Sequence, residues 1–502
     1  MNNGTFLAAI DLGSNSFRLE IGQYDLGQIQ RVDYLKETVR LGNGFDEERN
    51  LSAEAMTRGW DCLARFAERL AGFSAAQVRA VATQTLREAK NRDEFIQRGR
   101  EILGFPIEVI AGTEEARLIY QGVAQMLPQS TERRLVIDIG GRSTELVLGH
   151  DLQATQTASY RVGSVAWSMK YFPKGEFTEQ TLYRAEIAAQ AVLDEALTSY
   201  PRSQWDTAYG ASGTVGAVAD ILQLAGFPAG QISREGLIWL IKCLLRAGNV
   251  NLVALEGLKD DRRAVLGGGV SVLHGLMKLL RIDTLHVAEG ALRHGVLLEM
   301  VERDAHNTDA RDSSVQRLAQ KFAVDGTQAL RVARVAGRLL AQILPASADA
   351  TNLQAASTLQ RKLGWAAALH EIGMAISSSD YHKHGAYILQ NADTLGFSLP
   401  ELHRLGLLVL GHRGKLKKLE AAFEELSFVM QQLALRLAVI LCHARQDPQD
   451  EKLTLGYSAK RQRFTLTVDE VWAGDYPQSA HLLRQESVAW QKMLWGFEVL
   501  VQ

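Results

Sequence analysis

Residues 134–149 read RLVIDIGGRSTELVLG, and residues 6–24 read FLAAIDLGSNSFRLEIGQY. Both stretches run in the same order: an apolar segment ending in an aspartate (Asp138 or Asp11), a turn containing glycine, and a second largely apolar segment. Apolar segments separated by polar turn residues predict paired strands. Because the strand–turn–strand unit occurs twice, the sequence predicts two related α/β domains with a cleft between them.

The pattern around these units alternates between strands and helices as far as residue 305. We expect a helix at 52–71 with Ser52 as its N-cap, because apolar residues fall on one helical face. Further strands are expected at 78–83 and 106–110. The glycine run in GGGV, residues 267–270, is expected to form a turn.

The last two hundred residues have a different pattern. From about 306 to 446 the apolar spacing is almost entirely that of helices. Residues 452–472 then predict a hairpin, and residues 481–495 predict a helix that closes the chain.

Composition excludes several classes of protein. The 502 residues carry a formal charge of −2 and are 46% hydrophobic, which excludes a disordered chain and argues against nucleic acid as a partner. No stretch of about 18 apolar residues predicts a membrane span, and the N-terminus lacks the plan of a signal peptide. Three dispersed cysteines fit a reducing compartment. We therefore expect a cytoplasmic protein.

Three short loops containing glycine follow apolar strands: Gly13–Ser16, Gly140–Thr144 and Ser212–Thr214. Backbone N–H groups hold phosphate oxygens, and glycine lets the backbone approach them closely. Any one such loop is most often a simple turn. Three together, two of them in repeated units, indicate a phosphate-binding cleft.

Carboxylates accompany two of these loops. Asp11 and Asp138 end their strands, where open α/β sheets bind ligands. Glu145 lies in an apolar strand, where a carboxylate is costly unless it is paired or bound to a cation. Asp138 and Glu145 are therefore candidate ligands for Mg²⁺ held against a phosphate. The alternative is an edge strand that exposes Glu145 to solvent.

Glu114 and Glu115 begin a predicted helix for which Thr113 is the expected N-cap. Acidic residues there stabilise the helix dipole, which is sufficient reason for such a pair. The same position suits a general base that activates water. Arg87, just after a strand, is either a surface residue or a group that stabilises phosphoryl charge.

Several segments resemble one known family in order along the chain: AAIDLGSNSFRL, VATQTLREA, IEVIAGTEEARLIY, LVIDIGGRSTELVLG, YRVGSV, YGASGTV and EGALRHGVLLEM. They are similar to the exopolyphosphatase / guanosine-pentaphosphate phosphohydrolase family of the actin, sugar-kinase and heat-shock ATPase superfamily, and the chain most resembles the long exopolyphosphatases of that family. The resemblance implies an α/β plus all-α fold. Two actin-like (ribonuclease H-like) domains would span 1–122 and 123–305, with a helical HD-like domain at 306–446 and a small α+β domain at 447–502.

The resemblance also implies roles for individual residues. Glu115 would be the catalytic base, accompanied by Arg87, and Asp138 and Glu145 would be the Mg²⁺-associated acids. The residues implied to handle phosphate are Asp11, Ser14, Asn15, Gly141, Ser143, Thr144, Arg161, Gly213 and Thr214. Arg142 stands where the family usually has a third glycine, so it either restricts the turn or adds a phosphate contact.

By the same resemblance, the expected reaction is Mg²⁺-dependent release of orthophosphate from the end of inorganic polyphosphate. The alternative is the same chemistry on guanosine pentaphosphate (pppGpp), giving the tetraphosphate (ppGpp). Two other classes, a non-hydrolysing ATP-binding protein and a sugar or acid kinase, fit less well. A homodimer is expected, and peripheral association with a membrane stays open. The basic stretch 412–418 is either solvated surface or a track for a polyanion.

The helical region contains five of the twelve histidines: His370, His382, His384, His403 and His412. His370-Glu371 stands where HD phosphohydrolases have a His-Asp metal pair, and Gln328 stands where an upstream histidine ligand is expected. Because both ligands differ, the prediction is a degenerate HD-like domain that serves substrate binding and dimerisation.

Overall fold

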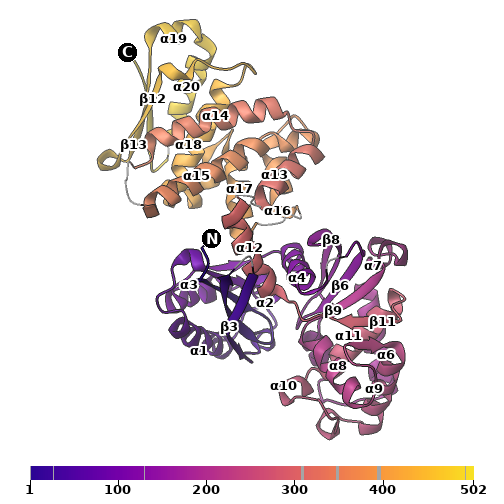
Figure 1. Cartoon of the computed structure of the whole chain (residues 1–502). Helices are drawn as coiled ribbons and strands as arrows, with labels where there is room; N and C mark the ends of the chain where they lie inside the picture. Colours follow the sequence, from indigo (N-terminus) through magenta and orange to yellow (C-terminus); the bar gives the residue numbers. More distant parts are fainter. Residues whose placement is uncertain are drawn as a thin grey trace. The chain divides into compact units, whose positions relative to one another are not determined.

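The computed structural model describes residues 2–25, 28–128, 130–306, 310–345, 350–392, 397–491 and 493–502. The chain divides into two compact units, residues 1–308 with 397–399, and residues 309–396 with 400–502 (Figure 1). Both strand–turn–strand repeats lie in the first unit, each in a sheet of its own.

The first sheet has five strands in the order β3-β2-β1-β4-β5. β1 pairs antiparallel with β2 and parallel with β4, which confirms the strands expected at 6–24 and 78–83. Ser52 caps α1 as expected, since its Oγ accepts from the N–H of Ala55. The elements are β1 (Thr5–Leu12), β2 (Phe17–Asp25), β3 (Gln28–Glu37), the 3₁₀ turn η1 (Leu41–Asn43), α1 (Ala53–Arg69), β4 (Val78–Ala82), α2 (Gln84–Glu88), α3 (Arg92–Leu103) and β5 (Ile107–Val109).

The second sheet has six strands in the order β10-β11-β9-β6-β7-β8. The second repeat forms the antiparallel pair β6 and β7, and β9 runs parallel to β6. Its strands are β6 (Arg134–Ile139), β7 (Thr144–His150), β8 (Gln153–Tyr160), β9 (Thr207–Ala211), β10 (Gln231–Ser233) and β11 (Thr284–Val287). Its helices are α5 (Ser164–Tyr171), α6 (Glu179–Val192), α7 (Ala196–Ser199), α8 (Gly213–Leu224), α9 (Arg234–Ala247), α10 (Asp260–Arg263) and α11 (Leu266–Leu279).

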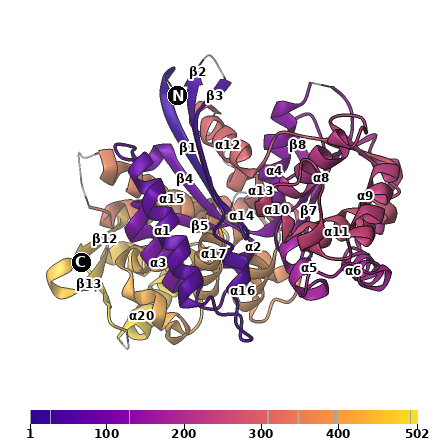
Figure 2. The ribbon, with the colours of Figure 1, turned by 90° about the horizontal axis from the view of Figure 1, so that it is seen from below.

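Two helices, α4 (Gly112–Met126) and α12 (Leu292–His306), pack against each other between the sheets (Figures 1 and 2). Their apolar side chains share one core with Leu7 of β1 and Val147 of β7. Their backbones come so close that a Cβ on Gly295 would overlap the carbonyl oxygen of Leu118. The domain boundary expected at residue 122 falls inside α4, so these helices are shared by the two lobes, the first lobe built on the sheet of β1–β5 and the second on the sheet of β6–β11.

Two local expectations were wrong. The glycine run 267–269 forms the first turn of α11 instead of a loop, because its glycines allow close helix packing: a Cβ on Gly268 would overlap the backbone of Ser164 and Ser168. Thr113 is not an N-cap, since α4 begins at Gly112 after Ala111 and no side chain caps it.

The second unit confirms the change to helices, and strands and two further helices follow α18; a separate small C-terminal domain stays a prediction. The hairpin expected at 452–472 forms from β12 and β13. The closing helix is only partly right, since the chain continues into β14, which pairs parallel with β13. The elements are α13 (Ala310–Lys321), α14 (Gly326–Ile343), α15 (Ala350–Leu369), α16 (Tyr381–Asn391), α17 (Leu399–Gly411), α18 (Leu426–Leu441), β12 (Leu453–Ser458), β13 (Arg463–Val468), α19 (Glu470–Asp475), α20 (Pro477–Trp490) and β14 (Gly496–Val501).

The HD-like character of the helical region stays a prediction. Among the described helices, none is long and apolar enough to cross a membrane.

Candidate active site

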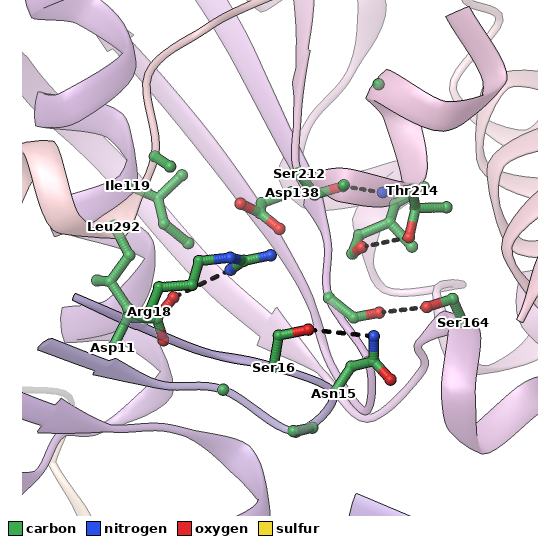
Figure 3. A pocket seen from close by; sticks show the side chains of 18 of the residues that line it. Asp11, Asn15, Ser16, Arg18, Ile119, Asp138, Ser164, Ser212, Thr214 and Leu292 are labelled. Carbon is green, nitrogen blue, oxygen red and sulfur yellow. Dashed lines mark hydrogen bonds and ion pairs between the residues drawn. The ribbon is translucent and has the colours of Figure 1, made fainter. Parts of the chain in front are cut away.

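A cleft of about 360 Å³ opens in the first unit, where the turns after β1, β6 and β9 meet (Figure 3). All three predicted phosphate loops line it, through Gly13, Ser14, Asn15, Ser16, Gly140, Gly141, Ser143, Ser212, Gly213 and Thr214. The first two loops are the turns of the two strand–turn–strand repeats. Each turn follows a strand that carries an aspartate. Asp11 and Asp138 both line the cleft.

The third loop leads into a helix N-terminus. Ser212 has φ of +99° and caps α8, since its Oγ accepts from the N–H groups of Thr214 and Val215 at 3.2 and 3.4 Å. The hydroxyl of Thr214 donates to the carbonyl of Ile139 at 2.9 Å, which joins this loop to the end of β6. N–H groups at a helix start favour a bound anion, and they face the same cleft as the other two loops.

Glu115 and Arg87 form a buried ion pair at the start of α4. Arg87 Nη1 lies 2.7 Å from Glu115 Oε2, and the same nitrogen donates to the carbonyl of Ile110 at 2.9 Å. Glu115 is 7% exposed and lines the cleft. Burial raises the pKa of the Glu115 carboxyl above its ordinary value, and Arg87 opposes that rise. Glu115 therefore meets the geometric requirement for a base facing the cleft.

Asp138 and Glu145 face each other across β6 and β7. Glu145 is only 1% exposed and accepts from Ser159 Oγ at 2.8 Å; the edge-strand alternative is wrong, because β7 lies between β6 and β8. Burial and the neighbouring Glu115 raise the pKa of Asp138 to about 7. The same causes raise the pKa of Glu145 well above its ordinary value.

These buried carboxylates have the chemistry that a hard cation requires. A divalent ion beside them would remove the mutual repulsion that raises their pKa values. In the described part of the chain, however, no three acidic, imidazole or thiol groups gather closely enough to hold a metal alone. Mg²⁺ is commonly bound by one or two carboxylates plus phosphate oxygens and water, and Asp138 and Glu145 fit that mode.

Five cations that the sequence analysis did not single out also line the cleft: Arg18, Lys36, Lys259, Arg262 and Arg293. Arg18 Nη1 lies 3.1 Å from Asp11 Oδ2, and its guanidinium extends towards Asp138 (Figure 3). Arg18 could have been inferred from the sequence, because the predicted hairpin pairs it with Asp11. Arg262 carries no comparable signal, since it comes from the short helix α10 and lies against Gly213 of a different loop.

Arg293 and His294 belong to the segment EGALRHGVLLEM, whose residues had no assigned role. The buried Glu20 accepts from Arg293 Nε at 3.1 Å and lies 3.2 Å from His294 Nε2. His294 Nδ1 accepts from the N–H of Ala291 at 3.1 Å, so Nε2 carries the proton that Glu20 accepts. Arg293 Nη1 lies 3.9 Å from Asp11 Oδ2. This network holds Arg293 beside the Asp11 carboxylate, which Arg18 also contacts.

Three residues implied to handle phosphate lie outside the cleft lining. Arg161 follows the edge strand β8 and is exposed, and Thr144 is buried with its hydroxyl bonded to the carbonyl of Val162 at 2.6 Å. Arg142 turns away to Glu88, with Nη2 at 3.2 Å from Glu88 Oε2. None of these three residues lines the cleft, and their contacts with phosphate stay predictions.

In the second unit, His370, His382 and His412 come together, with ring centroids of His412 at 5.5 Å from His370 and 6.2 Å from His382. Glu371 is bound by Arg445 at 2.7 Å, and Gln328 donates to the carbonyl of Cys442 at 2.9 Å. Across the residues that the structure describes, these groups form no metal-holding set.

Comparison with known proteins identifies the family of this chain. The model of the Ppx/GppA phosphatase family matches residues 21–304, and the model of domain III of the same phosphatases matches residues 310–487. The chain belongs to the Ppx/GppA phosphatase family. It is therefore a hydrolase of phosphoric anhydrides.

Similar proteins cover nearly the whole chain. Two relatives are named "Guanosine-5'-triphosphate,3'-diphosphate pyrophosphatase". The one from Vibrio cholerae is 38% identical over 96% of this chain and 97% of its own, and the one from Vibrio atlanticus is 37% identical over 98% of this chain and 97% of its own. Among solved structures, the Aquifex aeolicus PPX-GPPA enzyme is 26% identical with a TM-score of 0.50, and an exopolyphosphatase-like protein is 26% identical with a TM-score of 0.53. Each covers 59% of this chain and at least 98% of its own.

Proposed function

We propose that this Ppx/GppA phosphatase hydrolyses the terminal 5'-phosphoanhydride of pppGpp, giving ppGpp and orthophosphate. The observation that carries the proposal is the similarity, over nearly the full length, to proteins named for guanosine 5'-triphosphate 3'-diphosphate. The sequence alone favoured polyphosphate and held pppGpp as the alternative. The names of these relatives favour the alternative.

The cations of the cleft support a compact polyanion as substrate. Arg262 is 11% exposed at its side chain, and its Nε lies 3.8 Å from the carboxylate oxygen Oδ2 of Asp261. Asp261 is itself bound by Lys36 at 2.7 Å. A guanidinium with so little compensation suits a phosphate, because charge-assisted bonds to phosphate are strong and directional.

The chemistry follows from the position of Glu115. Its carboxylate takes the proton of a water molecule that attacks the terminal phosphorus, while N–H groups of the three loops hold the phosphate oxygens. Arg87 orients Glu115 and offers positive charge beside the attacked group. Mg²⁺ bound by Asp138 and Glu145 would neutralise phosphate charge. Catalysis would then rest on positioning and electrostatics.

The test is a direct comparison of substrates. Purified full-length protein is incubated with Mg²⁺ and either pppGpp or long-chain polyphosphate, and products are separated by anion-exchange chromatography. We expect ppGpp and orthophosphate in equal amounts, with a higher kcat/KM for pppGpp than for polyphosphate ends. A higher kcat/KM for polyphosphate would favour polyphosphate as the substrate and overturn this assignment.

A further inference from the structure

The side chain of Arg142, in the turn between β6 and β7, bonds to groups that do not line the cleft. Its Nε and Nη2 lie 3.3 and 3.2 Å from Glu88 Oε2, and its Nη1 donates to the carbonyl of Gly42 at 2.9 Å. Its guanidinium carbon also lies 4.7 Å from the centre of the Phe45 ring. Arg142 belongs to the β6–β7 turn of the second lobe, whereas all three partners belong to the first.

Hydrogen bonds connect Glu88 to the proposed catalytic pair, Arg87 and Glu115. Glu88 accepts from Gln84 Nε2 at 2.7 Å, and Gln84 Oε1 accepts from Arg87 Nε and Nη2 at 3.0 and 2.7 Å. Arg87 then donates to Glu115 at 2.7 Å. A single chain of hydrogen bonds therefore runs from Arg142 through Glu88, Gln84 and Arg87 to Glu115.

The same region joins two phosphate loops. The N–H of Gly42 donates to the carbonyl of Ser14 at 2.8 Å, so the backbone group that Arg142 binds belongs to a turn already fastened to the first loop. Gly141, next to Arg142, lies against the side chain of Ser14. Arg142 thus fastens the second loop over the first at the point where the lobes touch.

We propose that Arg142 is a positioning residue that clasps the two lobes and, through Glu88 and Gln84, fixes the orientation of the Arg87–Glu115 pair. Hydrolysis would then be efficient only when the two phosphate loops are together, because separating them breaks the chain at Arg142–Glu88. This inference rests on the proposed role of Glu115 but not on the identity of the phosphoanhydride substrate.

A direct phosphate contact would place Arg142 differently. A phosphate-binding arginine directs free donors at the cleft, whereas three donors of Arg142 already have protein acceptors and the residue is absent from the cleft lining. Its loss should therefore slow the chemical step and leave substrate binding largely intact.

The kinetic test compares Arg142→Gly, Arg142→Lys and Glu88→Gln with Arg133→Ala. Arg133 is a matched control, because it also pairs with a carboxylate, Asp206, at 2.7 Å and donates to a carbonyl, of Ser203, at 2.8 Å, all within the second lobe. We expect Arg142→Gly and Glu88→Gln each to lower kcat about 10–100-fold with KM changed less than about threefold. Lysine should restore part of the rate, the double variant should be no slower than either single, and Arg133→Ala should match wild type.

A second readout needs no substrate. Amide hydrogen exchange at residues 84–88 and 112–118 should accelerate in Arg142→Gly and Glu88→Gln but not in Arg133→Ala. A raised KM with unchanged kcat would reveal a direct substrate contact and overturn the proposal, as would unchanged kcat together with unchanged exchange. If the wild type prefers another phosphoanhydride, the same variants are assayed on that substrate, so failure of the substrate assignment is distinguished from failure of the clasp.

Discussion

At the scale of single residues, acidic groups that repel one another gather at the cleft and in the neighbouring strand β7. Asp138 and Glu145 are desolvated beside Glu115, and their pKa values are raised for that reason. Raised pKa values mean that the folded chain favours the protonated carboxyl over the charged form. A bound cation reverses this preference, so stability and metal binding are coupled at these residues.

The first prediction concerns Asp138, whose pKa of about 7 exceeds its ordinary 3.8. Between these values the folded state holds a proton that the unfolded state has lost, so stability falls as pH rises through this window. In metal-free buffer at about pH 8, Asp138→Asn should melt above wild type, by about 2–4 °C for each kcal/mol. Differential scanning calorimetry tests this, with the advantage expected to vanish near pH 4. An equal advantage at both pH values would contradict the account.

The second prediction concerns Arg262. Removing one charge-assisted contact to phosphate costs about 1.5–3 kcal/mol, which corresponds to a KM for pppGpp raised roughly 10–100-fold in Arg262→Ala. The neighbouring Arg263 is a matched control, because its side chain donates to the carbonyl of Val253 and does not line the cleft. Steady-state kinetics on both variants decides, and an unchanged KM in Arg262→Ala would remove it from the site.

At the scale of elements, α4 and α12 determine how the cleft is built. Their crossing permits the backbones to touch only because glycines stand there. The helix α4 also carries Glu115, so the packing that joins the lobes also positions the proposed catalytic base.

The third prediction follows from that crossing. A Cβ at Gly295 would meet the backbone of Leu118, whereas a Cβ at Gly216 in α8 would meet nothing within 4 Å. Gly295→Ala should destabilise the first unit by about 1–3 kcal/mol or more, because backbone cannot move aside cheaply. Gly216→Ala should be neutral or stabilising, since alanine favours helix. Urea unfolding of both variants provides the comparison; equal stability would show that the helices can separate without cost.

Elements whose residues form a local pattern could be predicted from the sequence. Elements whose conformation depends on contact with a distant segment could not. The repeated strands were predictable because apolar segments separated by polar turn residues are typical of paired strands. The glycines at 267–269 looked like a turn, and only the approach of α5 explains them within a helix. The three loops, Glu115 and Asp138 were singled out from their motifs, and the structure brings them to one cleft. Arg262 was not, because it reaches the cleft from a segment with no motif of its own.

At the scale of the whole molecule, the net charge of −2 gives no general attraction for an anion. Attraction must then come from the cations that line the cleft. The expected homodimer stays a prediction, which light scattering of the full chain would test against the monomer mass of 55.3 kDa.

The fourth prediction follows from that local charge. Salt screens exposed charges over about 10 Å at 0.1 M, so KM for pppGpp should rise several-fold between about 0.05 and 0.3 M KCl at constant free Mg²⁺. The kcat should change little, because buried pairs such as Arg87–Glu115 are screened much less. A KM independent of salt would mean that the cleft cations do not hold the substrate.

The most direct test of the central claim is the rate of orthophosphate release from pppGpp by wild type and Glu115→Gln, with Mg²⁺ present. Glutamine keeps the shape of the side chain and removes its ability to take a proton. The account predicts that the wild type forms ppGpp and that Glu115→Gln loses about 10²–10⁴-fold in kcat while still binding substrate. A wild-type rate in Glu115→Gln, or no release from pppGpp by the wild type, would contradict it.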